Sequence, residues 1–80
     1  MKFGVRIMPR SVLLDTQGRT VEKVLRDHSY ELDSLRVGKY VEIELNEKEA
    51  GRAEEKIKAM TEFVLYNPLI ETFVIERREG

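Results

Sequence analysis

The chain has 80 residues, of which 41% are hydrophobic and 36% are charged, and its formal net charge is −1. A chain of this length allows one domain, over residues 1–80, and buries only about 60% of the surface that its unfolded form exposes. There is no cysteine, which excludes zinc ribbons, thiol nucleophiles and disulfide scaffolds. The near-zero net charge argues against a general nucleic-acid binder. A second copy or a permanent partner is therefore an attractive way to complete the core.

The sequence carries no visible membrane or export signal. Its longest unbroken apolar run, over residues 63–66, is far shorter than the roughly 20 residues that span a bilayer. The N-terminal residues lead into an alternating pattern rather than into the continuous apolar stretch of a signal peptide. We therefore expect a cytoplasmic protein.

The first two elements are expected to be a strand and a helix. Alternating apolar residues over 3–8 predict a half-buried strand that ends at Pro9, which lacks a backbone donor. Asp15 can cap the helix that follows, and this helix is expected to run to Asp27 or His28. One apolar stripe follows from the spacing of Val21, Val24, Leu25 and His28.

Residues 35–45 are expected to form one long strand with a bend at Gly38 and Lys39. The alternative is two short strands joined by a tight turn at residues 37–39. A turn would be free to reset the alternation, yet the same parity continues through it, which favours the long bent strand. The apolar residues of this parity are Leu35, Val37, Val41, Ile43 and Leu45.

A second helix is expected from Asn46 to about Tyr66. Glu49 stands three residues after Asn46, which is the spacing of a capping box. Asn67 suits a left-handed cap at the end of this helix, and Pro68 forbids its continuation. The expected buried stripe comprises Ala50, Ala53, Ile57, Met60 and Val64. A final strand is expected over residues 69–76, with Phe73 and Ile75 on the core face, before a polar tail over residues 77–80.

This order of elements predicts an α+β fold. Each helix has one apolar stripe, so both are expected to pack on one face of a mainly antiparallel sheet. The result is a two-layer sandwich related to the ferredoxin-like arrangement, with a long bent central strand. An exposed edge of that strand would be a natural dimerisation surface.

The residues that carry chemistry do not form a recognisable catalytic set. His28 is the only histidine, so one chain cannot assemble a histidine metal cluster or a catalytic triad, and we expect it to pack or to cap. The carboxylates of the second helix fit a solvated face. Gly18 and Gly38 stand without the spacing that cradles a phosphate. The sequence predicts a chain that is not catalytic alone and that binds no cofactor or metal.

Two segments are not explained by core packing. Residues 14–18 place Gly18 in the first turn of a helix, and in residues 35–40 the cations Arg36 and Lys39 flank Gly38. As local structure, the first is a cap and the second is a bulge. As functional features, both are adaptable polar positions of the kind used at protein–protein contacts. The residues alone leave both interpretations open.

At these positions the chain resembles the PurS family, the small subunit of phosphoribosylformylglycinamidine synthase. The family's Leu-Asp-Pro-Gln-Gly, followed by Val-Glu and Leu, is similar to residues 14–18 with Val21, Glu22 and Leu25. Its Val-Arg-Val/Ile-Gly-Lys looks like residues 35–39, and its Leu-Asn-Pro with Ile-Glu and an aromatic looks like residues 66–73. These landmarks stand in order at matching spacing and, with the helices between them, cover nearly the whole chain. Thr16 stands where the family usually has proline, and the loop over residues 9–14 is slightly longer.

The resemblance implies a role in a synthase of purine biosynthesis that is divided among subunits. A glutaminase of the PurQ type releases ammonia from glutamine. A synthetase of the PurL type uses ATP and Mg²⁺ to convert formylglycinamide ribonucleotide to its amidine. The small subunit bridges the two as a homodimer, with pairing into tetramers left open, and helps to transfer ammonia. It has no catalytic residue of its own, and neither nucleic acid nor a membrane is expected as a partner.

Subunit contacts are expected at seven residues of these landmarks, namely Asp15, Gln17, Gly18, Arg36, Gly38, Lys39 and Asn67. For Asp15 and Asn67, a purely local structural role is an equal alternative.

Two other function classes compete with this interpretation. A strand, a proline-containing loop and a helix also suit an ACT-like regulatory domain that binds a free amino acid at a dimer interface. That class predicts measurable ligand affinity in the isolated chain. An RNA-binding module would require salt-sensitive oligonucleotide binding. Neither class accounts for the three ordered landmarks.

Overall fold

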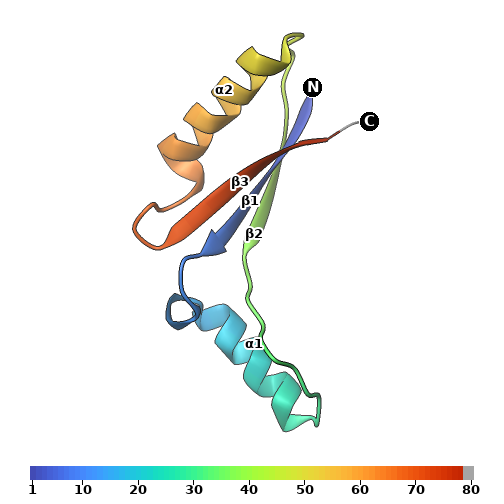
Figure 1. Cartoon of the computed structure of the whole chain (residues 1–80), viewed down its shortest axis with the longest axis vertical. Helices are drawn as coiled ribbons and strands as arrows, with labels where there is room; N and C mark the ends of the chain where they lie inside the picture. Colours follow the sequence, from blue (N-terminus) through green and yellow to red (C-terminus); the bar gives the residue numbers. More distant parts are fainter. Residues whose placement is uncertain (79–80) are drawn as a thin grey trace.

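A computed structural model describes residues 1–78, in which one helix lies along a three-stranded sheet and another extends beyond the end of that sheet (Figure 1). The α+β class and the antiparallel sheet predicted from the sequence are confirmed. Arg77 and Arg78, predicted as tail, belong to the last strand, and residues 79–80 of the predicted tail lie outside the described residues. The elements are β1 (Lys2–Pro9), the 3-10 turn η1 (Val12–Leu14), α1 (Thr16–Asp27), β2 (Lys39–Glu44), α2 (Ala50–Met60), the π-helical turn η2 (Thr61–Leu65) and β3 (Glu71–Arg78).

The strand order decides which helix covers the sheet. The order is β2-β1-β3, and β1 is antiparallel to both neighbours. The connection from β1 to β2 therefore leaves and re-enters the sheet at the same end. β2 and β3 are parallel to each other, so the chain must travel back along the sheet between them, and α2 does this across one face (Figure 1). The connectivity thus requires only α2 to lie on the sheet.

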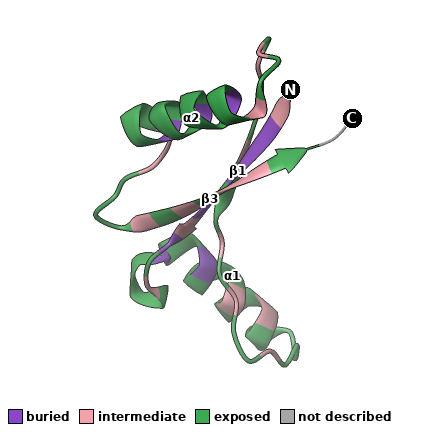
Figure 2. Cartoon of the chain, turned by 45° about the horizontal axis from the view of Figure 1, so that its top comes forward, coloured by how far each residue is buried: buried purple, intermediate pink, exposed green. Residues whose placement is uncertain are grey.

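The predicted position of the first helix on the sheet is wrong. α1 points away from the sheet, and Gly18 is its only buried residue (Figures 1 and 2). The radius of gyration is 15.8 Å, against about 12 Å for a compact chain of this length. The predicted apolar stripe is therefore open to solvent, and Val24 is 52% exposed. The physical reason is that α1 joins antiparallel neighbours, so no topological constraint folds it back.

The long central strand is also corrected. β2 has six residues and lies at an edge of the sheet, whereas β1 is central. The register pairs Lys39 with Ile7 near the end of β1, so residues 35–38 have no strand alongside them and approach β2 as irregular chain. The tight turn considered as an alternative is absent at residues 37–39 as well. The predicted parity holds, since Val41, Ile43 and Leu45 pack against the core.

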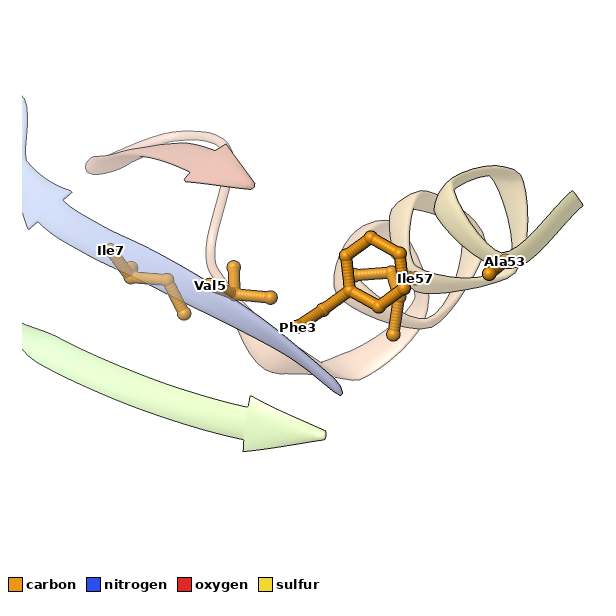
Figure 3. Packing of buried hydrophobic residues seen from close by; sticks show 5 residues of the cluster. All are labelled: Phe3, Val5, Ile7, Ala53 and Ile57. Carbon is orange, nitrogen blue, oxygen red and sulfur yellow. The ribbon is translucent and has the colours of Figure 1, made fainter. Parts of the chain in front are cut away.

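The core forms where β1 meets α2. Phe3, Val5 and Ile7 of β1 lie with Ala53 and Ile57 of α2, all of them at most 2% exposed. Figure 3 shows that the side chain of Phe3 extends from the strand toward Ile57. Figure 2 shows that most residues outside this core are exposed or half-buried. Each fully buried large apolar side chain contributes about 1.5–3 kcal/mol. Because the set is so small, substitutions within it are expected to be costly.

The buried stripe of α2 differs from the predicted one at its C-terminal end. Ala53, Ile57 and Thr61 are buried and Leu65 is half-buried, so the contacts recur every fourth residue. Four residues overshoot one α-helical turn by about 40°, and the wider π-helical turn of η2 absorbs this drift. The Thr61 hydroxyl donates to the Ile57 carbonyl oxygen at 2.8 Å, which satisfies a buried polar group. Met60 and Val64, predicted as core, are consequently exposed.

The ends of α1 agree with the sequence-based prediction. Asp15 is the N-cap, and its side chain accepts the Gly18 N–H. His28 is the C-cap, with its ring Nδ1 2.8 Å from the Val24 carbonyl oxygen, which is the capping role expected of it. Ser29 follows at φ 70°, and its N–H and that of Tyr30 donate to the carbonyl oxygens of Arg26 and Leu25. This pairing is a Schellman ending.

The predicted caps of α2 are wrong. The helix begins only at Ala50, and its N-cap Glu49 makes no side-chain capping bond, so the expected box with Asn46 does not form. Instead the Glu47 carboxylate accepts the N–H groups of Lys48 and Glu49 and pairs with Lys56 at 2.8 Å. At the other end the widened turn stops at an extended Tyr66, and Ser29 is the only non-glycine residue within 1–78 with positive φ. The expected left-handed cap at Asn67 is therefore absent.

Alanine substitutions at Ile57 and Val64 distinguish the buried stripe of α2 that the structure shows from the stripe that the sequence predicted. Ile57→Ala is expected to destabilise the fold by about 2–5 kcal/mol, because it opens a cavity beside Phe3. Val64→Ala is expected to change stability by no more than about 0.5 kcal/mol, because Val64 is exposed. Urea unfolding followed by circular dichroism measures both. Equal losses in the free energy of unfolding for the two variants would contradict the observation that Ile57 is buried and Val64 is exposed.

The interactions of Glu47 predict a pH dependence. The hydrogen bond from Lys56, followed by that from the Glu49 N–H, lowers the pKa of the Glu47 carboxyl. Its contribution to stability is therefore present at neutral pH and disappears as the pH falls through the lowered pKa of the folded state. Glu47→Gln is expected to unfold at lower urea than the parent at pH 7 and at the same urea at about pH 2.5. Glu55→Gln, on the exposed side of α2, is the matched control, and an equal gap at both pH values would refute the prediction.

Candidate functional site

One end of the sheet gathers the loops that the sequence singled out. β1 ends there, while β2 and β3 begin there, since Ile7 pairs with Lys39 and Pro9 with Glu71. We call the loop segments at this point, residues 10–15, 36–39 and 67–71, the loop end. All seven predicted contact residues lie in these segments or in the first turn of α1. The antiparallel register thus brings together segments that are distant in the sequence, and Arg10 donates to the carbonyl oxygens of Pro68 and Ile70.

Asp15 joins two segments of the loop end. Its Oδ1 accepts the Gly18 N–H and its Oδ2 accepts the Val37 N–H, each at 2.8 Å. The residue is 5% exposed, so its carboxylate is withdrawn from solvent and occupied by the chain's own backbone. A side chain on Gly18 would overlap this carboxylate. The cap at residues 14–18 and the segment before β2 are therefore parts of one structure.

The segment before β2 lies tightly against the end of β1. The Arg36 guanidinium donates to the Pro9 carbonyl oxygen. A Cβ on Gly38 would overlap the Ile7 carbonyl oxygen and the Met8 sulfur, so glycine is required for this close approach. Gly38 marks a backbone contact rather than the bend or bulge that was predicted.

Lys39 and Asn67 meet through Glu71. The Lys39 ammonium is 3.8 Å from one carboxylate oxygen of Glu71, and the other accepts the Asn67 N–H at 2.7 Å. The Asn67 side chain accepts the Leu69 N–H at 3.0 Å and so holds the turn into β3. Arg10 fastens the same turn by donating to the carbonyl oxygens of Pro68 and Ile70.

The loop end therefore has an internal layer and an exposed layer. Asp15 and Gly18 are buried, whereas Gln17, Arg36, Lys39 and Asn67 are exposed. The sequence interpretation missed Glu71 and Arg10, which connect the loops. Glu71 stands inside the third landmark, but its link to Lys39 depends on the pairing of β3 with β1, which no local pattern reveals.

Within residues 1–78, the buried polar side chains are paired inside the chain itself. Within residues 1–78, no three His, Cys, Asp or Glu side chains gather closely enough to hold a metal ion. In the same range, every buried side-chain nitrogen and oxygen has a hydrogen-bond partner, so no buried polar group is left to receive a ligand. No helix in the described part of the chain is long and apolar enough to cross a membrane. What the loop end presents is exposed cations and amides on a hydrogen-bonded support.

Comparison with known proteins yields one consistent set of relatives. The PurS family of phosphoribosylformylglycinamidine (FGAM) synthase matches residues 2–79. Subunit PurS of phosphoribosylformylglycinamidine synthase from Thermotoga maritima is 32% identical over 75 residues, which is 92% of each chain. The solved structure of B. subtilis PurS is similar with a TM-score of 0.81 at 33% identity, covering 98% of both chains. The solved structure of PurLQS from Thermotoga maritima contains a chain that matches with a TM-score of 0.84 at 32% identity, covering 94% of this chain and 93% of that one.

Proposed function

The chain belongs to the PurS family, whose members are subunits of FGAM synthase in purine biosynthesis, and on this premise we propose that it joins a glutaminase to a synthetase for the transfer of ammonia. The observation that carries the proposal is the similarity to a chain of the Thermotoga maritima PurLQS structure, at a TM-score of 0.84. PurL-type and PurQ-type subunits are accordingly the proposed partners. ATP and Mg²⁺ would be used by the synthetase, and the complex would be cytoplasmic.

A bridging role requires no catalytic residue from this chain. Ammonia released into water at neutral pH is protonated, and ammonium has no free electron pair for attack on an activated amide. Two separate active sites therefore need an enclosed connection, which a small subunit can help to complete by holding them together. In this proposal the exposed residues of the loop end, Gln17, Arg36, Lys39 and Asn67, contact the partners. The buried Asp15 and Gly18 support them from beneath, and Gly38 allows their segment to lie close to β1.

The same proposal includes a homodimer, and the exposed stripe of α1 supports it. Val21, Val24 and Leu25 lie on a helix that does not pack on its own sheet. Exposed apolar groups on one helix face are typical of a face that another surface covers. A second copy is the simplest source of that surface, because the core of this 80-residue chain is small.

The sheet offers a suitable receiving surface on only one face. Beside α2, Val41 and Ile43 are half-buried next to the core. The opposite face carries ion pairs, Lys2 with Glu42 at 3.6 Å and Arg6 with Glu76, so it suits solvent better than an apolar helix. We therefore propose that α1 of each copy packs beside α2 of the other. β2 also leaves one strand edge unpaired for the same contact.

Replacing an apolar residue of the α1 stripe is expected to weaken the dimer. Val24→Gln should raise the dimer dissociation constant by about tenfold or more, because the loss of one buried valine at each of two symmetric sites costs more than about 1.4 kcal/mol. Lys23→Gln, its neighbour on the other side of α1, is the matched control and should leave the constant unchanged. Analytical ultracentrifugation over a concentration series measures both. A monomeric parent chain, or equal effects of the two variants, would contradict the proposed contact.

The bridging function is tested by reconstituting the synthase from its three subunits. Omitting this chain is expected to abolish product formation from glutamine and to spare product formation from ammonium salt. Arg36→Ala or Lys39→Ala should raise the concentration needed for half-maximal glutamine-driven activity by about fivefold or more. Lys48→Ala, at the opposite end of the sheet, is the control. Undiminished glutamine-driven synthesis without the chain would refute the proposed function and favour a ligand-binding domain instead.

A further inference from the structure

Within a single chain, the direction of α1 is not set by hydrophobic packing. Gly18 is the only buried residue of the helix, and Figure 2 shows the rest of it exposed or only half-buried. A helix held in this way is free to adopt many angles unless polar contacts select one. These contacts must lie where the chain leaves and re-enters the sheet, at the loop end.

Residues 10–38, which we call the arm, are held together along their length. Near the tip, the Tyr30 N–H donates to the Leu25 carbonyl oxygen at 3.0 Å, and the Arg26 guanidinium donates to the Leu32 carbonyl oxygen at 2.8 Å. The loop after α1 therefore follows the helix back toward the sheet. At the base, the Val37 N–H reaches the Asp15 carboxylate.

Asp15 occupies the point where the arm meets the sheet. One carboxylate oxygen accepts from Gly18 in the first turn of α1, and the other accepts from Val37 in the returning segment. The next residue, Gly38, lies against Ile7 of β1. The two bonds of the carboxylate thereby connect the start of the helix to the returning segment, which at Gly38 lies against the central strand. Because the Asp15 carboxylate is buried, leaving either oxygen without a hydrogen bond would cost free energy. Both hydrogen bonds are therefore needed.

The position of this carboxylate also explains Gly18. A glycine inside a helix costs about 1 kcal/mol relative to alanine. A Cβ at this position would overlap the Asp15 carboxylate. Glycine at position 18 therefore lowers the stability of the helix, but it leaves room for the Asp15 carboxylate that connects the two segments.

We infer that Asp15 is a positioning residue that sets the direction of α1 relative to the sheet, in addition to capping the helix. The inference rests on the proposed function in one respect, because the direction of α1 matters to a second copy that receives it. Without the Val37 bond, α1 remains a helix but swings about its two connections to the sheet. The arrangement that presents the apolar stripe to a partner is then less populated.

The test separates capping from positioning. Asp15→Asn retains an oxygen for the Gly18 N–H, since asparagine caps helices as well as aspartate does. Its amide NH₂ then faces the Val37 N–H, so two donors meet. Asp27→Asn, at the exposed far end of α1, removes the same charge without touching the base of the arm and serves as the control.

The angle of the arm is measured within one chain. The sequence has no cysteine, so Thr20→Cys in α1 and Thr72→Cys in β3 provide the only two sites for spin labels. The labelled chain is measured below the dimer dissociation constant, so that no second copy fixes the direction of α1. Pulsed electron paramagnetic resonance should give a narrow distance distribution for the parent and for Asp27→Asn, and a broad one for Asp15→Asn. Amide exchange at Val37 should accelerate about tenfold in Asp15→Asn, while the helix content measured by circular dichroism stays constant.

Each outcome decides the inference. A distribution as narrow in Asp15→Asn as in the parent would overturn it, as would loss of α1 helix content, which would reduce Asp15 to a cap. A broad distribution with helix retained supports it. Because the distance lies within a single chain, that result stands even if dimerisation proves unchanged, in which case the proposed dimer surface is the part that fails.

Discussion

The pairing of β1 with a strand on each side is the constraint on which the rest of the structure depends. Since both neighbours run antiparallel to β1, they are parallel to each other, and the chain between them must cross the sheet. That crossing places α2 over Phe3 and Val5 and creates the core. The same pairing does not require α1 to lie on the sheet. It also brings three loops to one end of the sheet. Core, arm and candidate site all follow from this register.

The division between a small core and an open arm gives the chain its functional character. α2 and β1 share a few fully buried side chains, whereas α1 carries an apolar stripe that its own sheet does not cover. Such a chain has apolar surface available for contact with other subunits. An exposed apolar surface agrees with membership of the PurS family, whose members are subunits of FGAM synthase. The polar layer at the loop end then acts as the frame that holds the exposed groups in place.

Much of the site could be predicted from the sequence because its signals are local. The Asp15 cap, the glycine in the first turn of α1 and the cations around Gly38 each belong to short motifs, and all of them reach the loop end. Their partners could not be predicted, since the links from Asp15 to Val37 and from Lys39 to Glu71 cross between segments that are distant in the sequence. Asn67 shows the limit of a local rule, because its side chain accepts a hydrogen bond in the turn after η2 instead of adopting a left-handed cap.

The sequence by itself determined the elements that depend on neighbouring residues. The alternation of β1, the limits of α1 and the parity of Val41 and Ile43 follow from periodicity and from capping, which act over a few residues. Tertiary structure alone decided the length of β2, the phase of the α2 stripe and the direction of α1. A strand continues only while another strand lies beside it, and a stripe is buried only where another surface meets it. Those conditions depend on the pairing of distant segments, which local periodicity does not encode.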